Sequence, residues 1–374
     1  AQISLALAAL ERGAHPDAVP QPDQRDQRSA MMIAVTMPDL RLLRALIAKG
    51  AEVNRLHGGI TPLVAATRDS YQGRPEAVTT VLANGADARA VDAMGNTPLH
   101  HAACCADPVI AALLLDAAAG VDAPNGDGVT ALGIACGNAN WSVASFLLEH
   151  GARIEGDGAQ SALVHAAGIA DDDAVGVNIL LRQRANVDAR APLERTALMT
   201  AALAGNPGIV ESLLAGGASV DLVDHRGTTA LMEAARSGCV AAIHSLGKRK
   251  ANPDASDANS RTALIIACQT RHASEEAVRA LLALGADRAR VDGDGKRALE
   301  HAAAAGRWHI VALLDPAYPL PSNLGGGVPA QAASADHLLD ALRFGHWNVA
   351  AEFVGMLADW PPNALADLYA DLAD

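Results

Sequence analysis

Aromatic side chains are scarce in this sequence of 374 residues. They make up 3% of it, although hydrophobic residues make up 50%. A chain of this length corresponds to two or three domains of ~150 residues, and the core of a large globular domain usually draws much of its buried area from aromatic side chains. We therefore expect a thin core of Ala, Leu, Val and Ile in an elongated rather than a spherical molecule.

Basic residues are in the minority. There are 29 Lys and Arg residues against 42 Asp and Glu residues, so the formal net charge is −13. Nucleic acid and anionic membrane surfaces would repel such a chain unless its basic residues were clustered, and we expect neither as a partner. No apolar run approaches the ~18 residues that span a bilayer, and we find no signal-peptide pattern. The 50% hydrophobic and 19% charged content excludes full disorder.

Cysteine is also infrequent. The five cysteines form an odd set that includes the adjacent pair Cys104 and Cys105, which is a poor basis for a disulfide framework. This usage suits a reducing compartment, and we predict the cytoplasm.

Motifs for catalysis are missing. The sequence has no G-x-S-x-G turn, no H-E-x-x-H helix and no Walker loop. Residues 292–295 (DGDG) resemble the start of a calcium-binding loop, but Ala303 stands at the twelfth position, where a carboxylate is needed. We interpret this segment as a tight turn, and we predict no enzyme activity, no cofactor and no bound metal.

A repeat does run through the chain. Copies of a T-P/A-L-x-x-A pattern recur about every 33.5 residues, and every copy has an Ala five positions after its first residue. A period of this size is typical of units that stack into solenoids. The copies begin at Ser29, Thr61, Thr97, Thr130, Ser161, Thr196, Thr229, Thr262 and Arg297, and a degenerate copy begins at Asp336.

Each copy predicts two short helices. The Thr at the first position is a good N-cap, and the following Leu and Ala residues form a narrow apolar stripe at helical spacing. A second stripe, such as Ile209, Val210, Leu213 and Leu214, predicts a second helix, which a Gly such as Gly217 ends in the left-handed conformation. A side chain at that position is strained, so we expect a different helix ending where the Gly is replaced, at Ala118, Arg184 and Lys250.

The segment 92–100 (DAMGNTPLH) closely resembles the ankyrin repeat, and the rest of the array, to about residue 358, resembles it more loosely. The resemblance implies an all-α ankyrin-repeat solenoid of stacked helix-turn-helix units with β-turn fingers, in about ten repeats. We place the array at residues 1–315, a Pro- and Gly-rich insertion at 316–335, and a degenerate repeat with a capping helix at 336–374. Residues 1–17 look like the second helix of a partial first repeat, so we expect a piece of a longer polypeptide.

Partners of such an array are expected in its concave groove, between the fingers and the first helices. The resemblance places groove residues four, three and one positions before the start of each copy, and seven and eight positions after it. Tyr71 is added because it lies in a longer loop, where an aromatic side chain can anchor an interface. The candidate partner-binding residues are therefore Arg195, His225, Arg226, Arg236, Arg261, Gln269, Lys296, Met94, Asn96 and Tyr71.

The cations among these residues allow two interpretations. An acidic segment of a partner protein can lie along them, since Arg recognises carboxylates through paired hydrogen bonds. Alternatively, they are solvated finger residues paired with local carboxylates such as Asp224, Asp257 and Asp292.

Two further residue types recur at fixed positions of the repeat. We interpret the histidines at one first-helix position as groove lining rather than a metal site, and the tryptophans at the start of second helices as partly buried structural residues. These are His101, His165 and His301, and Trp141, Trp308 and Trp347.

The leading functional prediction is a monomeric, non-enzymatic scaffold that binds a partner protein in its groove, where an acidic segment is the ligand under the first of the two interpretations. The alternative is a targeting or regulatory arm of a larger multidomain protein, such as a secreted bacterial effector delivered into a host cell. The Ala-rich composition suggests a bacterial source.

Overall fold

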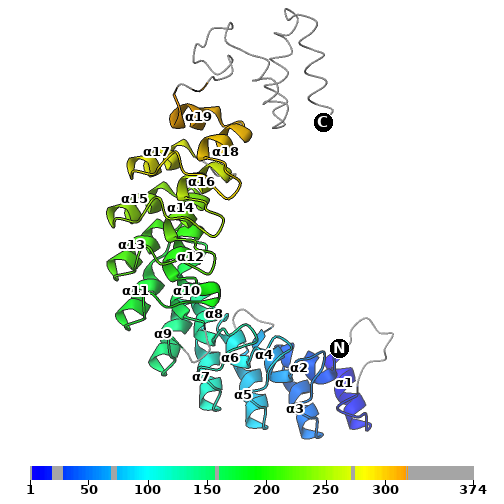
Figure 1. The fold of residues 1–374 in the computed structure, drawn as a ribbon. Helices are drawn as coiled ribbons and strands as arrows, with labels where there is room; N and C mark the ends of the chain where they lie inside the picture. Colours follow the sequence, from blue (N-terminus) through cyan, green and yellow to red (C-terminus); the bar gives the residue numbers. More distant parts are fainter. Residues whose placement is uncertain are drawn as a thin grey trace, which may run out of the picture. The chain divides into compact units, whose positions relative to one another are not determined.

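The computed structural model describes residues 2–18, 28–68, 74–155, 160–270, 274–316 and 318 (Figure 1). Tyr71, most of the predicted insertion at 316–335 and all of the predicted repeat at 336–374 lie outside these residues. The chain divides into two compact units, which we describe separately. Unit 1 comprises Ala1–Thr200 with Ala215–Ala218, and unit 2 comprises Ala201–Leu214 and continues from Ser219.

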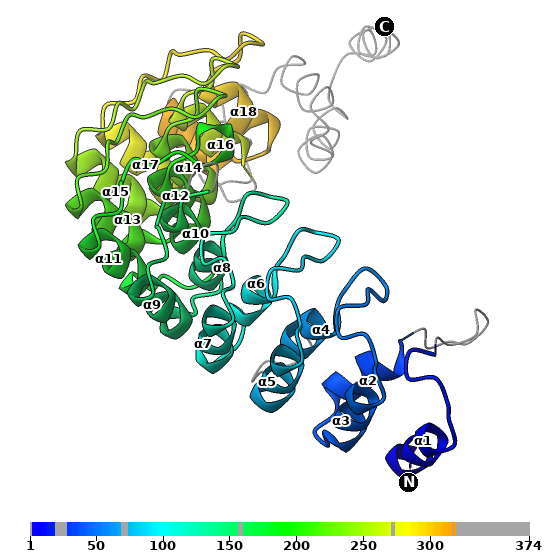
Figure 2. The same ribbon diagram turned by 90° about the horizontal axis from the view of Figure 1, so that it is seen from below.

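Unit 1 is a stack of helix pairs. Its helices are α1 (Gln2–Glu11), α2 (Ala30–Thr36), α3 (Arg41–Ala48), α4 (Pro62–Arg68), α5 (Pro75–Ala83), α6 (Pro98–Ala102), α7 (Val109–Asp116), α8 (Ala131–Gly137), α9 (Trp141–Glu149), α10 (Ala162–Ala167) and α11 (Val175–Arg182). The first helices α2, α4, α6, α8 and α10 contact one another in that order, while α5 contacts α7 and α9 contacts α11 in a second layer (Figure 2). Helix α1 contacts α3.

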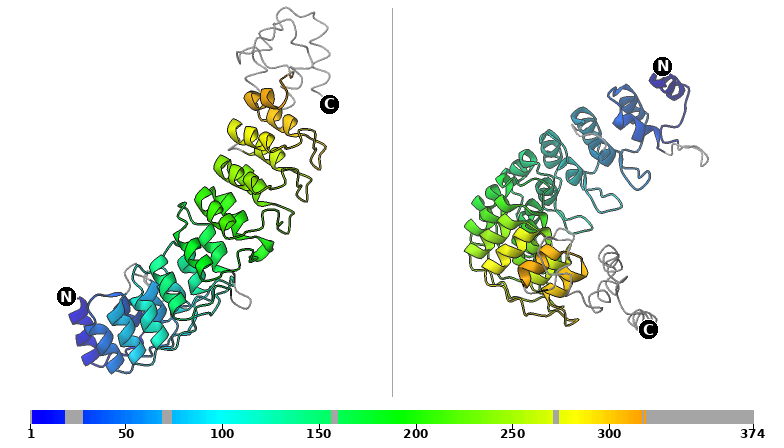
Figure 3. Two further views of the ribbon diagram at one scale, coloured as in Figure 1. Left: turned by 90° about the vertical axis from the view of Figure 1, so that its left-hand side faces the viewer. Right: turned by 90° about the horizontal axis from the view of Figure 1, so that it is seen from above.

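Unit 2 repeats the arrangement. Helices α12 (Ala197–Ala204) and α13 (Pro207–Ala215) lie at the boundary of the units, and α14 (Ala230–Ser237), α15 (Val240–Lys248), α16 (Ala263–Gln269), α17 (Glu275–Ala283), α18 (Ala298–Ala304) and α19 (Trp308–Leu314) follow. The first helices α14, α16 and α18 form one layer, and the second helices α15, α17 and α19 form the other (Figure 3).

The repeated Ala explains how closely the first helices pack. In nine copies the Ala five positions after the first residue has an exposed fraction of 0%. A methyl side chain at this position lets the backbones of neighbouring helices approach without leaving a void. These residues are Ala34, Ala66, Ala102, Ala135, Ala166, Ala201, Ala234, Ala267 and Ala302.

The first residue of most copies caps its helix as predicted. The hydroxyl of Thr229, for example, accepts a hydrogen bond of 3.3 Å from the backbone N–H of Met232, and Thr130 and Thr262 cap α8 and α16 in the same way. These hydroxyls are buried, so each also satisfies a helix N-terminal donor that water cannot reach.

The expectation of different endings at the three replaced glycines is wrong. Ala118, Arg184 and Lys250 have φ values of 60°, 63° and 64°, in the same left-handed region as the glycines at this position. Each is followed by the same capping bond, as when the N–H of Ala251 donates to the carbonyl of Leu246 at 3.2 Å. The packing of the next repeat therefore outweighs a backbone strain of about 1–2 kcal/mol at each position.

The fingers are short hairpin turns that precede the first helices. In four of them the backbone N–H of an Asp donates to the carbonyl oxygen four residues later, at 2.9–3.1 Å. These turns begin at Asp92 in unit 1 and at Asp224, Asp257 and Asp292 in unit 2.

Candidate functional site

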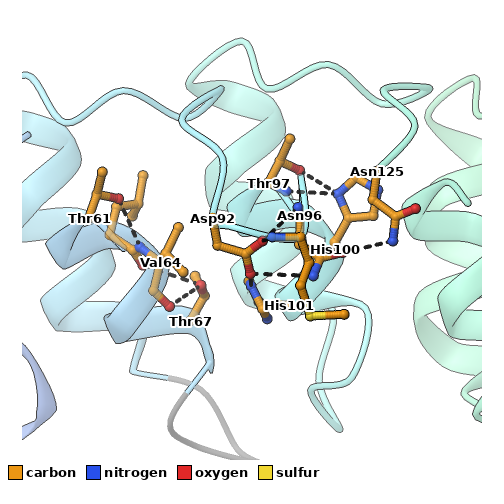
Figure 4. Close-up of polar contacts among 11 residues, drawn as sticks. Thr61, Val64, Thr67, Asp92, Asn96, Thr97, His100, His101 and Asn125 are labelled. Carbon is orange, nitrogen blue, oxygen red and sulfur yellow. Dashed lines mark hydrogen bonds and ion pairs between the residues drawn. The ribbon is translucent and has the colours of Figure 1, made fainter. Parts of the chain in front are cut away.

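In unit 1, Asp92 joins a finger to the first helix of the same repeat (Figure 4). Its Oδ1 accepts the backbone N–H groups of Met94 and Asn96, both at 2.9 Å, and its Oδ2 lies 2.9 Å from Nε2 of His101 on α6. Burial alone would raise the pKa of Asp92, but the hydrogen bonds from Asn96 and His101 outweigh burial and hold this pKa below its usual value. The carboxylate therefore stays charged and fixes the finger on the helix.

Neighbouring fingers of unit 1 are also linked. Nδ2 of Asn125 donates to Oδ1 of Asn96 at 2.8 Å (Figure 4), and the N–H of Gly126 donates to the carbonyl of Met94 at 2.9 Å. A Cβ at Gly126 would lie 2.7 Å from that carbonyl oxygen, so this approach requires glycine. Of the two predicted site residues here, Asn96 is half-buried and holds the turn, while the side chain of Met94 is 64% exposed and available to a partner.

His100 is a buried structural residue of the same repeat. Its Nδ1 lies 3.0 Å from the backbone N–H of Thr97 (Figure 4), and its Nε2 lies 2.9 Å from the carbonyl oxygen of Val129. A carbonyl only accepts, so Nε2 carries the proton and Nδ1 accepts, which is the neutral imidazole. Burial lowers the pKa of His100 and keeps it in this form.

In unit 2 the structure pairs two of the predicted cations with carboxylates. Nη2 of Arg261 lies 2.7 Å from Oδ2 of Asp257, whose side chain is 2% exposed. Nε of Arg236 lies 2.9 Å from Oε2 of Glu233, whose side chain is 4% exposed. The charges of Arg236 and Arg261 are therefore largely balanced within the unit.

Arg226 and Lys296 differ from that pair. Both are exposed, and within the part of the chain that the structure describes neither forms an ion pair. Nε of Arg226 donates to Nε2 of the neighbouring His225 at 3.3 Å. The carbonyl of Arg226 also accepts the N–H of Ala258 at 2.7 Å, which ties its finger to the next one.

Gln269 and Arg195 are the remaining predicted residues that the structure describes. Gln269, exposed at the end of α16, has its amide nitrogen 3.1 Å from Nε2 of His301. Arg195 belongs to unit 1, where its carbonyl accepts the N–H of Ala191 at 2.8 Å. Unit 2 thus carries six of the predicted residues on three consecutive repeats: His225, Arg226, Arg236, Arg261, Gln269 and Lys296.

Sequence reasoning missed the pairing of Asp292 with His301. Oδ2 of Asp292 lies 2.6 Å from Nε2 of His301, and Oδ1 holds the turn by accepting the N–H groups of Asp294 and Lys296. Burial would raise the pKa of Asp292, but the hydrogen bonds from Lys296 and His301 lower it. The signal was present, since an Asp precedes a His by nine residues here, as Asp92 precedes His101.

Three copies of the family model for ankyrin repeats match the chain, at residues 70–157, 163–257 and 243–318. The chain belongs to the ankyrin repeat family. The crystal structure of the human ASB11 ankyrin repeat domain is similar, with a TM-score of 0.52 and 29% sequence identity over 60% of this chain and 98% of that one. Protein PhlB of Serratia liquefaciens is 38% identical over 112 residues, which cover 27% of this chain and 46% of PhlB.

Ankyrin repeats are in general non-enzymatic protein–protein interaction modules. No three His, Cys, Asp or Glu side chains among the described residues are placed to hold a metal ion. All five cysteines are free thiols, and burial raises the pKa of Cys136 and of Cys268 to about 12. Within the same residues, no helix has the length and hydropathy needed to cross a membrane.

Proposed function

We propose that this ankyrin array is a non-enzymatic scaffold that binds an acidic segment of a partner protein on the face formed by its fingers and first helices. The observation that carries the proposal is the exposure of Arg226 and Lys296 on fingers of one unit, without an ion pair in the described residues. The positive charge of each side chain is therefore open to a carboxylate of the partner, and the guanidinium of Arg226 is suited to bidentate recognition.

The fingers present these cations on a fixed frame. Asp224 holds the finger of Arg226 by accepting two backbone N–H groups, and Asp292 does the same for the finger of Lys296. Binding to a preformed surface loses less conformational entropy than binding that must first order a loop. Asp294 is exposed on the same finger as Lys296, so this finger favours a ligand that presents its carboxylate to Lys296 and away from Asp294.

A capture experiment tests the proposal. The chain is immobilised, exposed to lysate of the source cells, and compared with the double variant Arg226→Glu and Lys296→Glu. The control carries Arg41→Glu and Arg279→Glu, which change the net charge equally at exposed second-helix positions. We expect a partner that the native chain and the control retain and the double variant loses, and a synthetic acidic peptide from that partner should compete. Equal retention by all three proteins would contradict the proposal.

A second candidate places the same face in a larger protein, as its targeting or regulatory arm, for example in a secreted bacterial effector. The similarity to a Serratia protein favours a bacterial source for this arm. The nucleotide sequence of the whole gene tests it, because the candidate requires a catalytic motif or an export signal encoded beside the array.

A further inference from the structure

The second-helix layer of unit 2 contains a hollow on a different surface from the fingers. It has a volume of about 590 Å³ and opens between α13, α15 and α17. Glu211 of α13 lines one side, Ala241, Gly247 and Lys248 of α15 line the middle, and Leu284 at the end of α17 lines the other side. We call this site the α15 hollow.

Gly247 makes the apolar floor of the α15 hollow possible. A Cβ at this position would lie 2.3 Å from Cδ2 of Leu284, so the Leu side chain lies against the backbone of α15 and would have to shift for any larger residue. Gly247 and Leu284 stay half-exposed and Ala241 is exposed, so the floor is an apolar surface open to solvent.

One edge of the α15 hollow carries Lys248, the first of three consecutive cations in the chain. Lys248, Arg249 and Lys250 are consecutive, all three are exposed, and none forms an ion pair with the described residues. The opposite edge carries Glu211, whose Oε1 accepts a hydrogen bond of 3.1 Å from Oγ of Ser245. Lys248 therefore lines an apolar surface, and Arg249 and Lys250 follow it directly at the end of α15, in a chain whose formal net charge is −13.

We propose that the α15 hollow docks a short acidic segment of a partner protein that carries one large aliphatic side chain. The aliphatic side chain covers Gly247 and Leu284, and the flanking carboxylates pair with Lys248, Arg249 and Lys250. Charge complementarity selects the acidic ligand, and the apolar floor selects the aliphatic group.

A peptide fits this surface better than a nucleic acid does. Tight binding of DNA commonly uses on the order of 6–10 phosphate contacts. Here one cation, Lys248, lines the hollow, two more follow it in the chain, and an acidic residue, Glu211, lies on the far side. The α15 hollow lies on second helices, so this proposal does not depend on the one made for the fingers.

Two labelled glutamate-rich peptides test the proposal by fluorescence anisotropy with the full chain. The peptides are identical except that a central Leu in one is Ser in the other. We expect the Leu peptide to bind more tightly than the Ser peptide. The double variant Lys248→Glu and Arg249→Glu should raise the Kd of the Leu peptide about tenfold. Increasing salt should weaken binding further. Filling the hollow with Ala241→Phe should weaken the Leu peptide and leave the Ser peptide unchanged.

The matched control is Arg41→Glu with Arg44→Glu, which changes the net charge equally at two exposed positions of α3 in unit 1. We expect it to leave the Kd of the Leu peptide unchanged. The milder pair Lys248→Gln and Arg249→Gln, with circular dichroism of every variant, separates lost binding from lost folding. Three results would each overturn the proposal. They are equal Kd values for the two peptides, equal losses of affinity in both charge-reversed variants, and tighter binding of a single-stranded oligonucleotide of the same charge. If one of these results occurs while Arg226→Glu with Lys296→Glu still abolishes capture from lysate, the α15 hollow is rejected and the finger proposal stands.

Discussion

The indole ring of Trp141 lies directly against the backbone of Gly176. A Cβ at Gly176 would be 2.1 Å from Cζ3 of the indole, a distance that real structures do not contain. The indole Nε1 donates to Oδ2 of Asp173 at 3.0 Å, which fixes the ring over α11. The start of one second helix is thereby locked onto the next.

Replacing Gly176 by Ala should therefore destabilise the array. The clash with Trp141 outweighs the gain in helix propensity, and we expect the free energy of unfolding to fall by about 1–2 kcal/mol, measured by urea denaturation. Gly137→Ala is the matched control, because a Cβ there meets only Cβ of His165 at 3.8 Å, and it should be neutral or stabilising. Equal effects of the two substitutions would show that Trp141 does not constrain position 176.

Removing Arg261 should expose the cost of a buried carboxylate. In Arg261→Ala the side chain of Asp257, which is 2% exposed, loses its ion pair, and we expect a loss of about 1–3 kcal/mol in the free energy of unfolding. Arg41→Ala breaks an ion pair with the more exposed Asp39 and should cost clearly less, because solvent screens an exposed pair. Chemical denaturation of both variants measures the difference, and similar midpoints would contradict the assignment of Asp257 as a buried partner.

Stability should fall when the solution is acidified below the ordinary pKa of histidine. Burial lowers the pKa of His100 and of His165 in the folded protein from 6.5, so the unfolded chain binds more protons just below this pH. The free energy of unfolding therefore decreases as the pH falls through about 6.5, and thermal melts from about pH 7.5 to pH 5 record the decrease. His165→Leu should flatten the dependence, and an unchanged slope would show that His165 does not contribute.

The cysteines should differ sharply in reactivity with a thiol reagent. Cys104 is exposed, whereas Cys136 and Cys268 are buried with a pKa of about 12. Because the thiolate is the reactive form, we expect Cys104 to be labelled in the native protein, and Cys136 and Cys268 only after denaturation. Mass spectrometry of the labelled peptides checks this, and early labelling of Cys268 would indicate that unit 2 opens under native conditions.

The sequence was sufficient to predict the repeat and its local chemistry. The Ala of each copy is buried in every copy that the structure describes, and Thr130, Thr229 and Thr262 cap their helices as expected. These features depend on neighbours within one helical turn or on a residue size that recurs at a fixed period. Such interactions can be inferred from spacing alone.

The tertiary structure decided which charged side chains form ion pairs and which glycines lie in close contact with another repeat. The spacing predicted both Arg226 and Arg261 as partner-binding residues. In the folded unit, the turn that positions Asp257 pairs this carboxylate with Arg261. The contact of Gly176 with Trp141 and the α15 hollow join side chains from different repeats. Which side chains meet across repeats depends on how the helix layers pack, and the left-handed Lys250 shows that this packing can override a local preference. No spacing within one repeat contains that information.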